Sequence, residues 1–152
     1  MKTMTPDLPL SVTHGVWDRC LSLHLQRAAR AMARRFDDAL RPVGLTNGQF
    51  SLLVALNRPE QPRIGAVASL LAMDRTTLTA NLKPLERRGL LTVARDPEDR
   101  RSRRLNLTDA GRDLLSRAVP IWRAAHDEVD RTLQNRDRDD LVAGLAALSV
   151  PR

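Results

Sequence analysis

The stretch that decides the fold is DPEDRRSRRLNLTDAG, which spans residues 96–111. Its second half, and the segment just before it, alternate apolar and polar residues as strands with one buried face do. An Asp-Pro pair and a run of charges separate the two alternating segments. The pattern therefore predicts a β-hairpin with strands over 91–95 and 103–107 and a long polar tip.

Amphipathic helical patterns occupy most of the remaining chain. Apolar residues recur at steps of three and four, and Thr46 and Gln49 have the spacing of a capping box, which marks a helix start. We predict a loose arm over 1–12 and helices over 14–41, 46–56, 65–72, 74–88, 109–133 and 137–148. With one hairpin among six helices, the predicted fold is mainly α (α+β).

The composition indicates a globular chain with an anionic partner. The 152 residues are 42% hydrophobic and carry a formal net charge of +7, which favours nucleic acid. Aromatic residues make up only 3%, with no Tyr. This scarcity argues against RNA and single-stranded DNA, whose bases stack on aromatic side chains. Double-stranded DNA is therefore the predicted partner.

A helix-turn-helix is predicted just before the hairpin. Asp74 has the position of an N-cap for its second helix. Leu78, Leu82 and Leu85 share one face of this helix and are expected in the core, which leaves the opposite face free to enter the major groove. The residues expected to contact DNA from this helix are Arg75, Thr76, Thr77, Lys83 and Arg87.

Arginines gather at the tip and in the second strand of the hairpin. Arg100, Arg101, Arg103 and Arg104 fall within five residues. An arginine at a hairpin tip can enter the narrow, electronegative minor groove. We expect Arg100, Arg101 and Arg103 to contact DNA, and Asp99 to pair with Arg101 and fix its direction.

Several motifs resemble those of the MarR-type transcriptional regulators, and the resemblance covers roughly residues 16–148. The matching stretches are DPEDRR (96–101), LNLTDAG (105–111), DRTTLT (74–79), LERRGL (85–90) and GLTNGQF (44–50). They correspond to the family's wing, its recognition helix and the end of that helix, and the start of its second helix.

The resemblance implies a winged helix-turn-helix homodimer that binds a pseudo-palindromic operator. It implies an N-terminal arm and dimerisation helix over 1–44, a DNA-binding lobe over 45–108 and C-terminal dimerisation helices over 109–152. It gives Arg101 the minor-groove contact and Asp99 the role of orienting it. Such a protein is a ligand-responsive repressor or activator, and we expect a repressor that an effector releases from DNA.

Two residues of the predicted recognition helix are irregular. Many relatives have Arg where this chain has Ala80, which leaves open a missing base contact and a different half-site preference. Pro84 removes a helical hydrogen bond, so a kink is expected near the end of the helix.

The resemblance also implies a response to a small aromatic or phenolic effector, bound between the dimer base and the DNA-binding lobe. The candidate pocket residues are Cys20, His24, Trp122 and His126. An oxidant-sensing branch of the family has a reactive thiol near the position of Cys20. However, its neighbouring Tyr hydroxyls are absent here, and Cys20 falls on the apolar face, so an inert core thiol is the preferred interpretation.

Other functions find less support in the sequence. The chain contains no triad arrangement, Gly-rich phosphate loop or metal motif, so we expect neither an enzyme nor a cofactor or metal site. One cysteine excludes an internal disulfide. With no signal peptide and no apolar run long enough for a membrane span, a cytoplasmic location is predicted. A sequence-independent architectural DNA binder remains the alternative.

Overall fold

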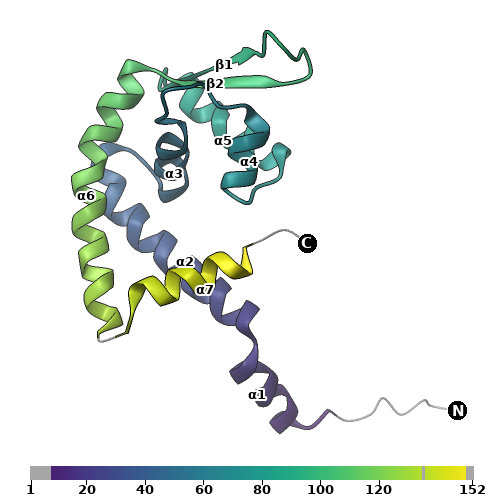
Figure 1. Ribbon diagram of the computed structural model, residues 1–152. Helices are drawn as coiled ribbons and strands as arrows, with labels where there is room; N and C mark the ends of the chain where they lie inside the picture. The colour runs from purple at the N-terminus through teal and green to yellow at the C-terminus, as the bar shows by residue number, and fades with distance from the viewer. Residues whose placement is uncertain (1–7, 135, 150–152) are drawn as a thin grey trace, which may run out of the picture.

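The computed structural model describes residues 8–134 and 136–149, in which a lobe of helices and one β-hairpin sits at one end of a helical arm (Figure 1). The helices are α1 (Leu10–Arg19), α2 (Leu21–Leu40), the short 3₁₀ helix η1 (Arg41–Val43), α3 (Asn47–Leu56), α4 (Ile64–Leu70), α5 (Arg75–Arg87), α6 (Asp109–Leu133) and α7 (Arg138–Leu148). The strands β1 (Leu91–Arg95) and β2 (Arg103–Leu107) pair antiparallel, with Leu91 opposite Leu107 and Arg95 opposite Arg103. No helix in the described part of the chain is long and apolar enough to cross a membrane.

One apolar core holds the lobe together. Helices α3, α4 and α5 pack beneath the hairpin, α6 runs down one side of the lobe beside α3, and the C-terminal part of α2 packs against α3 and α6 (Figure 1). Leu53, Leu78, Leu85 and Leu105 in this core have no more than traces of exposed surface. Burial of each such leucine contributes roughly 1.5–3 kcal/mol. A second, smaller cluster around Phe36 joins α2 to α6.

The junction between the hairpin and α6 explains the sequence LTDAG. The Thr108 side chain accepts a hydrogen bond from Gly111 N at 3.1 Å and donates one to Gly89 O at 2.7 Å. It therefore caps α6 and also holds the end of α5 against the start of α6. A Cβ at Gly111 would overlap the carbonyl oxygen of Leu90, so only glycine permits this close approach. The hairpin is thus tied at its base to the helical arm.

The predicted hairpin and helices are largely confirmed. Both strands and α6 have the predicted bounds, and Thr46 and Gln49 form the predicted capping box. Helix α5 continues through Pro84 to Arg87. The helix predicted over 65–72 is shorter, because Ala72 takes a left-handed conformation with φ of 51° that ends α4.

The single helix predicted over 14–41 was wrong. The chain breaks at Cys20, whose ψ of 96° is extended, so α1 and α2 are separate helices. Helix α1 begins at Leu10, inside the predicted loose arm, while residues 1–7 of that arm lie outside the described residues. Helix α1 has no buried residue, so Val16 and Cys20 are not part of a core, and Cys20 is half-buried rather than enclosed.

Candidate nucleic-acid interface

The start of α5 is fixed by a carboxylate cap. The Asp74 carboxylate accepts hydrogen bonds from the Thr77 hydroxyl at 2.6 Å and from Thr77 N at 2.8 Å. These bonds, that from the Thr77 side chain first, lower the pKa of Asp74 below its ordinary value. The Thr77 hydroxyl proton is therefore occupied by the cap, and only the oxygen lone pairs of this predicted contact remain for DNA.

The exposed face of α5 forms a shallow cationic hollow. Leu78, Leu82 and Leu85 are buried as predicted. The opposite face encloses about 350 Å³ between Arg75, Thr76, Thr79, Ala80 and Lys83. The small side chain at Ala80 leaves space between the two cations. The structure thus brings together three of the predicted contacts and adds Thr79, whose hydroxyl donates to Arg75 O at 2.7 Å; Arg87 lies exposed in the last turn.

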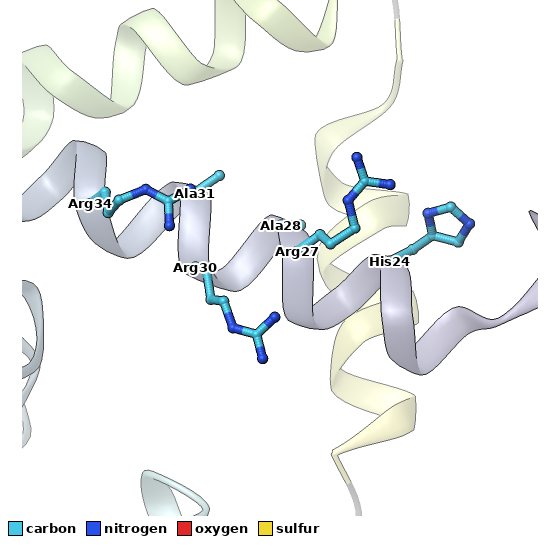
Figure 2. Close-up of a pocket in the computed structure, with 6 residues that line it drawn as sticks. All are labelled: His24, Arg27, Ala28, Arg30, Ala31 and Arg34. Atoms are coloured by element: carbon cyan, nitrogen blue, oxygen red, sulfur yellow. The ribbon is translucent and has the colours of Figure 1, made fainter. Parts of the chain in front are cut away.

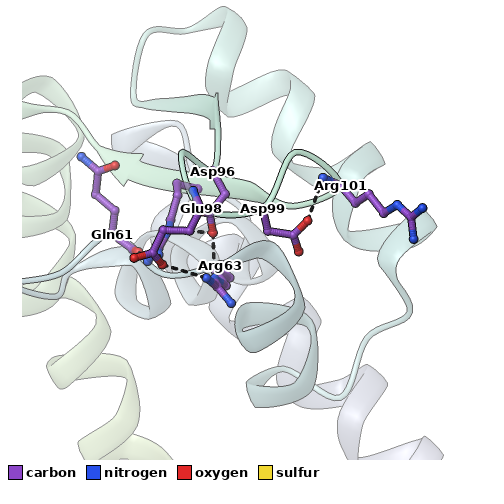
Figure 3. A network of polar contacts seen from close by, with 7 residues as sticks. Gln61, Arg63, Asp96, Glu98, Asp99 and Arg101 are labelled. Atoms are coloured by element: carbon purple, nitrogen blue, oxygen red, sulfur yellow. Dashed lines mark hydrogen bonds and ion pairs between the residues drawn. The ribbon is translucent and has the colours of Figure 1, made fainter.

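The wing tip is held by Asp99 through the backbone. The Asp99 carboxylate accepts a hydrogen bond from Arg101 N at 2.9 Å, and Asp99 O accepts one from Ser102 N at 2.9 Å. The predicted pairing of Asp99 with the Arg101 guanidinium is absent from the described residues. Figure 3 shows this guanidinium pointing away from Asp99. Asp99 therefore shapes the turn that carries Arg101, while Arg100 and Arg101 are exposed and Arg103 is half-buried.

A buried carboxylate lies at the base of the wing. Asp96 directly follows β1, and its side chain is fully buried. Its Oδ2 accepts a hydrogen bond from Arg104 Nε at 3.0 Å and forms an ion pair with Arg63 Nε at 2.7 Å, and its Oδ1 accepts a hydrogen bond from Glu98 N at 3.0 Å. Glu98 also pairs with Arg63 at 3.1 Å and with Arg104 at 3.5 Å. Two carboxylates and two guanidinium groups thus form the closed network seen in Figure 3.

The electrostatics of this network favour the ionised carboxylate. Burial raises the pKa of Asp96, but the hydrogen bond from Glu98 N and the charges of Arg104 and Arg63 together outweigh burial, so the net pKa is lowered. Arg104 also donates to Gln61 O at 3.0 Å. This arginine of the predicted basic cluster is therefore committed to the protein itself.

Arg63 was not predicted from the sequence as part of the site. It lies 33 positions before Asp96, and no local pattern connects them. The only signal was Pro62, since the residue before a proline tends to be extended and an extended segment can lie along a strand. The structure shows this arrangement: Leu105 N donates to Pro62 O at 3.0 Å, and Arg63 forms an antiparallel bridge with Arg104.

The four predicted effector residues do not line one pocket within a chain. Trp122 and His126 lie together, with ring centroids 4.8 Å apart, and Trp122 stacks on Phe36 at 6.5 Å. His24 is twelve residues before Phe36 on α2, about 18 Å along the helix axis at 1.5 Å per residue. Cys20 lies further away still, beyond the start of α2.

His24 instead borders a hollow on the solvent side of α2. The hollow is also lined by Arg27, Ala28, Arg30, Ala31 and Arg34, and its volume is about 520 Å³ (Figure 2). The hollow lies on the arm, away from the hairpin and α5 (Figure 1). It is therefore separate from the predicted DNA contacts.

An apolar hollow of about 310 Å³ does include Trp122, at the boundary between the lobe and the arm. Its lining comes from α3, from α6 and from the end of α4. The lining residues are Phe50, Ser51, Val54, Ala55, Leu70, Leu71 and Trp122. In the described residues, no three His, Cys, Asp or Glu side chains are grouped as a metal site would require.

Comparison with known proteins gives a consistent result. Residues 45–102 match the MarR family. The organic hydroperoxide resistance transcriptional regulator of Bacillus subtilis is 33% identical over 108 residues, which cover 71% of this chain and 74% of the relative. The relatives are transcriptional regulators, in agreement with the prediction that the chain is not an enzyme.

Two similar solved structures contain DNA. The M. tuberculosis transcriptional regulator MosR in complex with DNA is 37% identical, with a TM-score of 0.78 over 86% of this chain and 94% of that one. The transcriptional repressor CouR bound to a 23-mer DNA duplex is 34% identical, with a TM-score of 0.77 over 95% of this chain and 99% of that one. CouR has also been solved with p-coumaroyl-CoA, at 32% identity and a TM-score of 0.77 over 91% of this chain and 97% of that one.

The Asp96 network should make the stability of the folded protein depend on pH in the acidic range. Because the folded-state pKa of Asp96 lies below its ordinary value of 3.8, its stabilisation is complete above pH 3.8 and is lost as pH falls through the lower, folded-state pKa. Asp96→Asn should lower the unfolding midpoint by roughly 5 °C at pH 7, because it leaves two guanidinium groups beside a neutral amide. Thermal unfolding followed by circular dichroism at pH 7, 5 and 3.5 measures the difference between the two proteins. The difference should be constant from pH 7 to 5 and shrink at pH 3.5; an increase there would contradict this assignment.

Proposed function

Because the chain belongs to the MarR family of transcriptional regulators, we propose that it is a homodimeric repressor that binds a pseudo-palindromic duplex operator. The observation that carries this proposal is the pairing of a hollow, cationic face on α5 with a wing tip whose Arg101 has no carboxylate partner among the described residues. Both surfaces carry positive charge at adjacent positions on one lobe (Figure 1).

Helix α5 fits the major groove. Its exposed face offers Arg75 and Lys83 for phosphates and bases, and Thr76 and Thr79 as smaller polar groups. Arg101 on the wing then reaches the neighbouring minor groove, where the negative potential favours a guanidinium group. The two DNA-bound relatives share this fold at more than 30% identity, which supports the same use of the lobe here.

A second copy of the chain is the proposed cover for α1 and α7. Neither helix has a buried residue. Helices of 10 and 11 residues are marginal in water without tertiary packing. Their exposed apolar side chains are Leu10, Val12, Val16, Trp17, Leu141, Val142, Leu145 and Leu148. Association of two copies through these helices would bury this surface and place two lobes on half-sites about one helical turn apart.

The apolar hollow beside Trp122 is the proposed effector site. An aromatic ligand there would contact α3 and α4 of the lobe and α6 of the arm, so its binding can change the position of the lobe. A complex of CouR with p-coumaroyl-CoA supports an effector with an aromatic group.

We also place the protein in the cytoplasm, because a bacterial transcriptional regulator works where the chromosome lies.

Oxidant sensing through Cys20 is the second candidate. Cys20 is half-buried at the break between α1 and α2, so a peroxide can approach it more readily than the core position predicted from sequence would allow. Oxidation of the thiolate to sulfenic acid, with reduction of the peroxide to water or an alcohol, would add a polar group at this junction. The similarity to an organic hydroperoxide resistance regulator also favours this candidate.

Removal of the wing arginine tests the DNA proposal. Arg101→Ala should weaken binding to a duplex selected by the protein from random sequences by about tenfold or more, and should reduce the magnitude of the salt slope by about 1. Fluorescence anisotropy at several salt concentrations measures both quantities. The matched control is Arg117→Ala, on the exposed side of α6, which should bind nearly as the wild type does. Equal affinity and equal slope for Arg101→Ala would contradict the wing contact, and equal affinity for selected and random duplexes would favour an architectural binder.

The dimer can be tested by placing charges on α7. Leu141→Lys with Leu145→Lys should convert the dimer to a monomer, because the charges would have to be buried in the apolar contact. The control is Ala143→Lys with Ala147→Lys, which adds the same charges to the same exposed helix away from its leucines. Multi-angle light scattering should give half the mass for the leucine variant only. Two dimers, or two monomers, would contradict the proposed interface.

Release of the protein from DNA can distinguish an aromatic effector from an oxidant as the signal. p-Coumarate or p-coumaroyl-CoA should lower the affinity for the selected duplex severalfold and should lose this effect in Val54→Trp, which fills the hollow. Organic hydroperoxide should act only on protein with Cys20 intact, so Cys20→Ser is its control. Anisotropy titrations of the three proteins measure both responses. Loss of the peroxide response in Cys20→Ser would establish the second candidate, and a peroxide effect that survives would eliminate it.

A further inference from the structure

Arg63 is the only member of the charged network at the wing base that comes from outside the hairpin. Asp96, Glu98 and Arg104 all belong to the segment that forms the two strands and their connection. Arg63 is the residue immediately before α4, the first helix of the helix-turn-helix. The side chain of Arg63 therefore connects two structural units, whereas the other three side chains act within one.

The Arg63 side chain holds the wing at two points. Its Nε lies 2.7 Å from Asp96 Oδ2, and its Nη2 lies 3.1 Å from Glu98 Oε2. The rigid fork of a guanidinium can span both carboxylates at once, which the single ammonium group of a lysine cannot do in the same way. Because Asp96 is fully buried and Glu98 is 73% exposed, the contact with Asp96 is the stronger of the two.

A small change at this base would displace the tip. A two-stranded hairpin is marginally stable by itself, so its direction depends on what holds its base. Arg101 lies three residues from Arg104 in the direction of the wing tip, which is a distance of about 10 Å at 3.3 Å per residue. A tilt of about 15° at the base would therefore move the tip by about 3 Å, which is as long as a hydrogen bond.

We propose that Arg63 is a positioning residue for DNA binding that sets the angle between the wing and the helix-turn-helix. It acts through Asp96, so that Arg101 meets the minor groove while α5 occupies the major groove, and Arg63 does not itself contact DNA. This inference rests on the proposed contact between Arg101 and DNA. In the absence of Arg63, Arg104 and Glu98 N still stabilise Asp96, so the chain should fold.

A double-mutant cycle tests whether Arg63 acts through the wing. The affinity for a duplex selected by the wild-type protein is measured for Arg63→Gln, Arg101→Ala and the double variant. Arg63→Gln should weaken binding about tenfold, and Arg101→Ala should cost less than threefold when added to it. Arg63→Lys, which keeps the charge but loses the fork, should fall between Arg63→Gln and the wild type.

The matched control is Arg58→Gln. Arg58 is exposed in the same loop, five residues before Arg63, and its side chain has no hydrogen bond or ion pair with the described residues. Arg58→Gln removes the same charge as Arg63→Gln and should change the affinity for the selected duplex by less than threefold. Additive losses from Arg63→Gln and Arg101→Ala would overturn the proposal, because they would indicate that Arg63 contacts DNA independently. An equal loss in Arg58→Gln would overturn it as well, since general charge would then explain the effect.

Hydrogen exchange gives a readout that does not depend on DNA. The amides of Asp96, Arg101 and Ser102 are bonded within the wing. In Arg63→Gln they should exchange at least severalfold faster, while the amides of α5 change little and the unfolding midpoint falls by less than it does in Asp96→Asn, because Arg104 and Glu98 N still bond Asp96. Unchanged wing exchange would overturn the proposal. If the wild-type protein selects no duplex, the proposed function fails, and the exchange result still decides whether Arg63 holds the wing.

Discussion

The buried carboxylate of Asp96 is the constraint on which the DNA-binding lobe depends. Removal of an ion from water is costly, and here two guanidinium groups and a backbone amide offset that cost. These partners come from the segment before α4, from β2 and from the wing connection. One side chain thereby links the base of the wing to the helix-turn-helix, and Asp99 then shapes the turn at the tip.

This constraint divides the arginines into two groups. Arg63 and Arg104 are neutralised by Asp96 and Glu98, so they serve the fold. Arg101 has no such partner in the described part of the chain, and Asp99 shapes its turn through the backbone. The positive charge of the wing is therefore concentrated at its tip, where a minor groove can receive it. A surface that bound DNA only through its overall positive charge would not require Arg63 and Arg104 to be neutralised while Arg101 stays without a carboxylate partner among the described residues.

Local patterns predicted most of the fold but less of the site. The strands, the capping box and the bounds of α6 depend on neighbours in sequence, and they were predicted correctly. The break at Cys20 was missed because apolar spacing continues through it, while α1 buries no residue against the described part of the chain. The ion pair of Arg63 with Asp96 and the separation of His24 from Trp122 are consequences of tertiary packing, which spacing along the sequence does not contain.

Helix α4 has the anchor of the wing at one end and the apolar hollow beside Trp122 at the other. Lobe, wing and hollow therefore meet in one short element, so the wing and α5 should contact DNA together. Hydroxyl-radical footprinting on a selected duplex tests this most directly. We expect two minor-groove protections from the wings, placed symmetrically on the outer sides of two α5 half-sites. Protection confined to the half-sites, or spread evenly along the duplex, would contradict it.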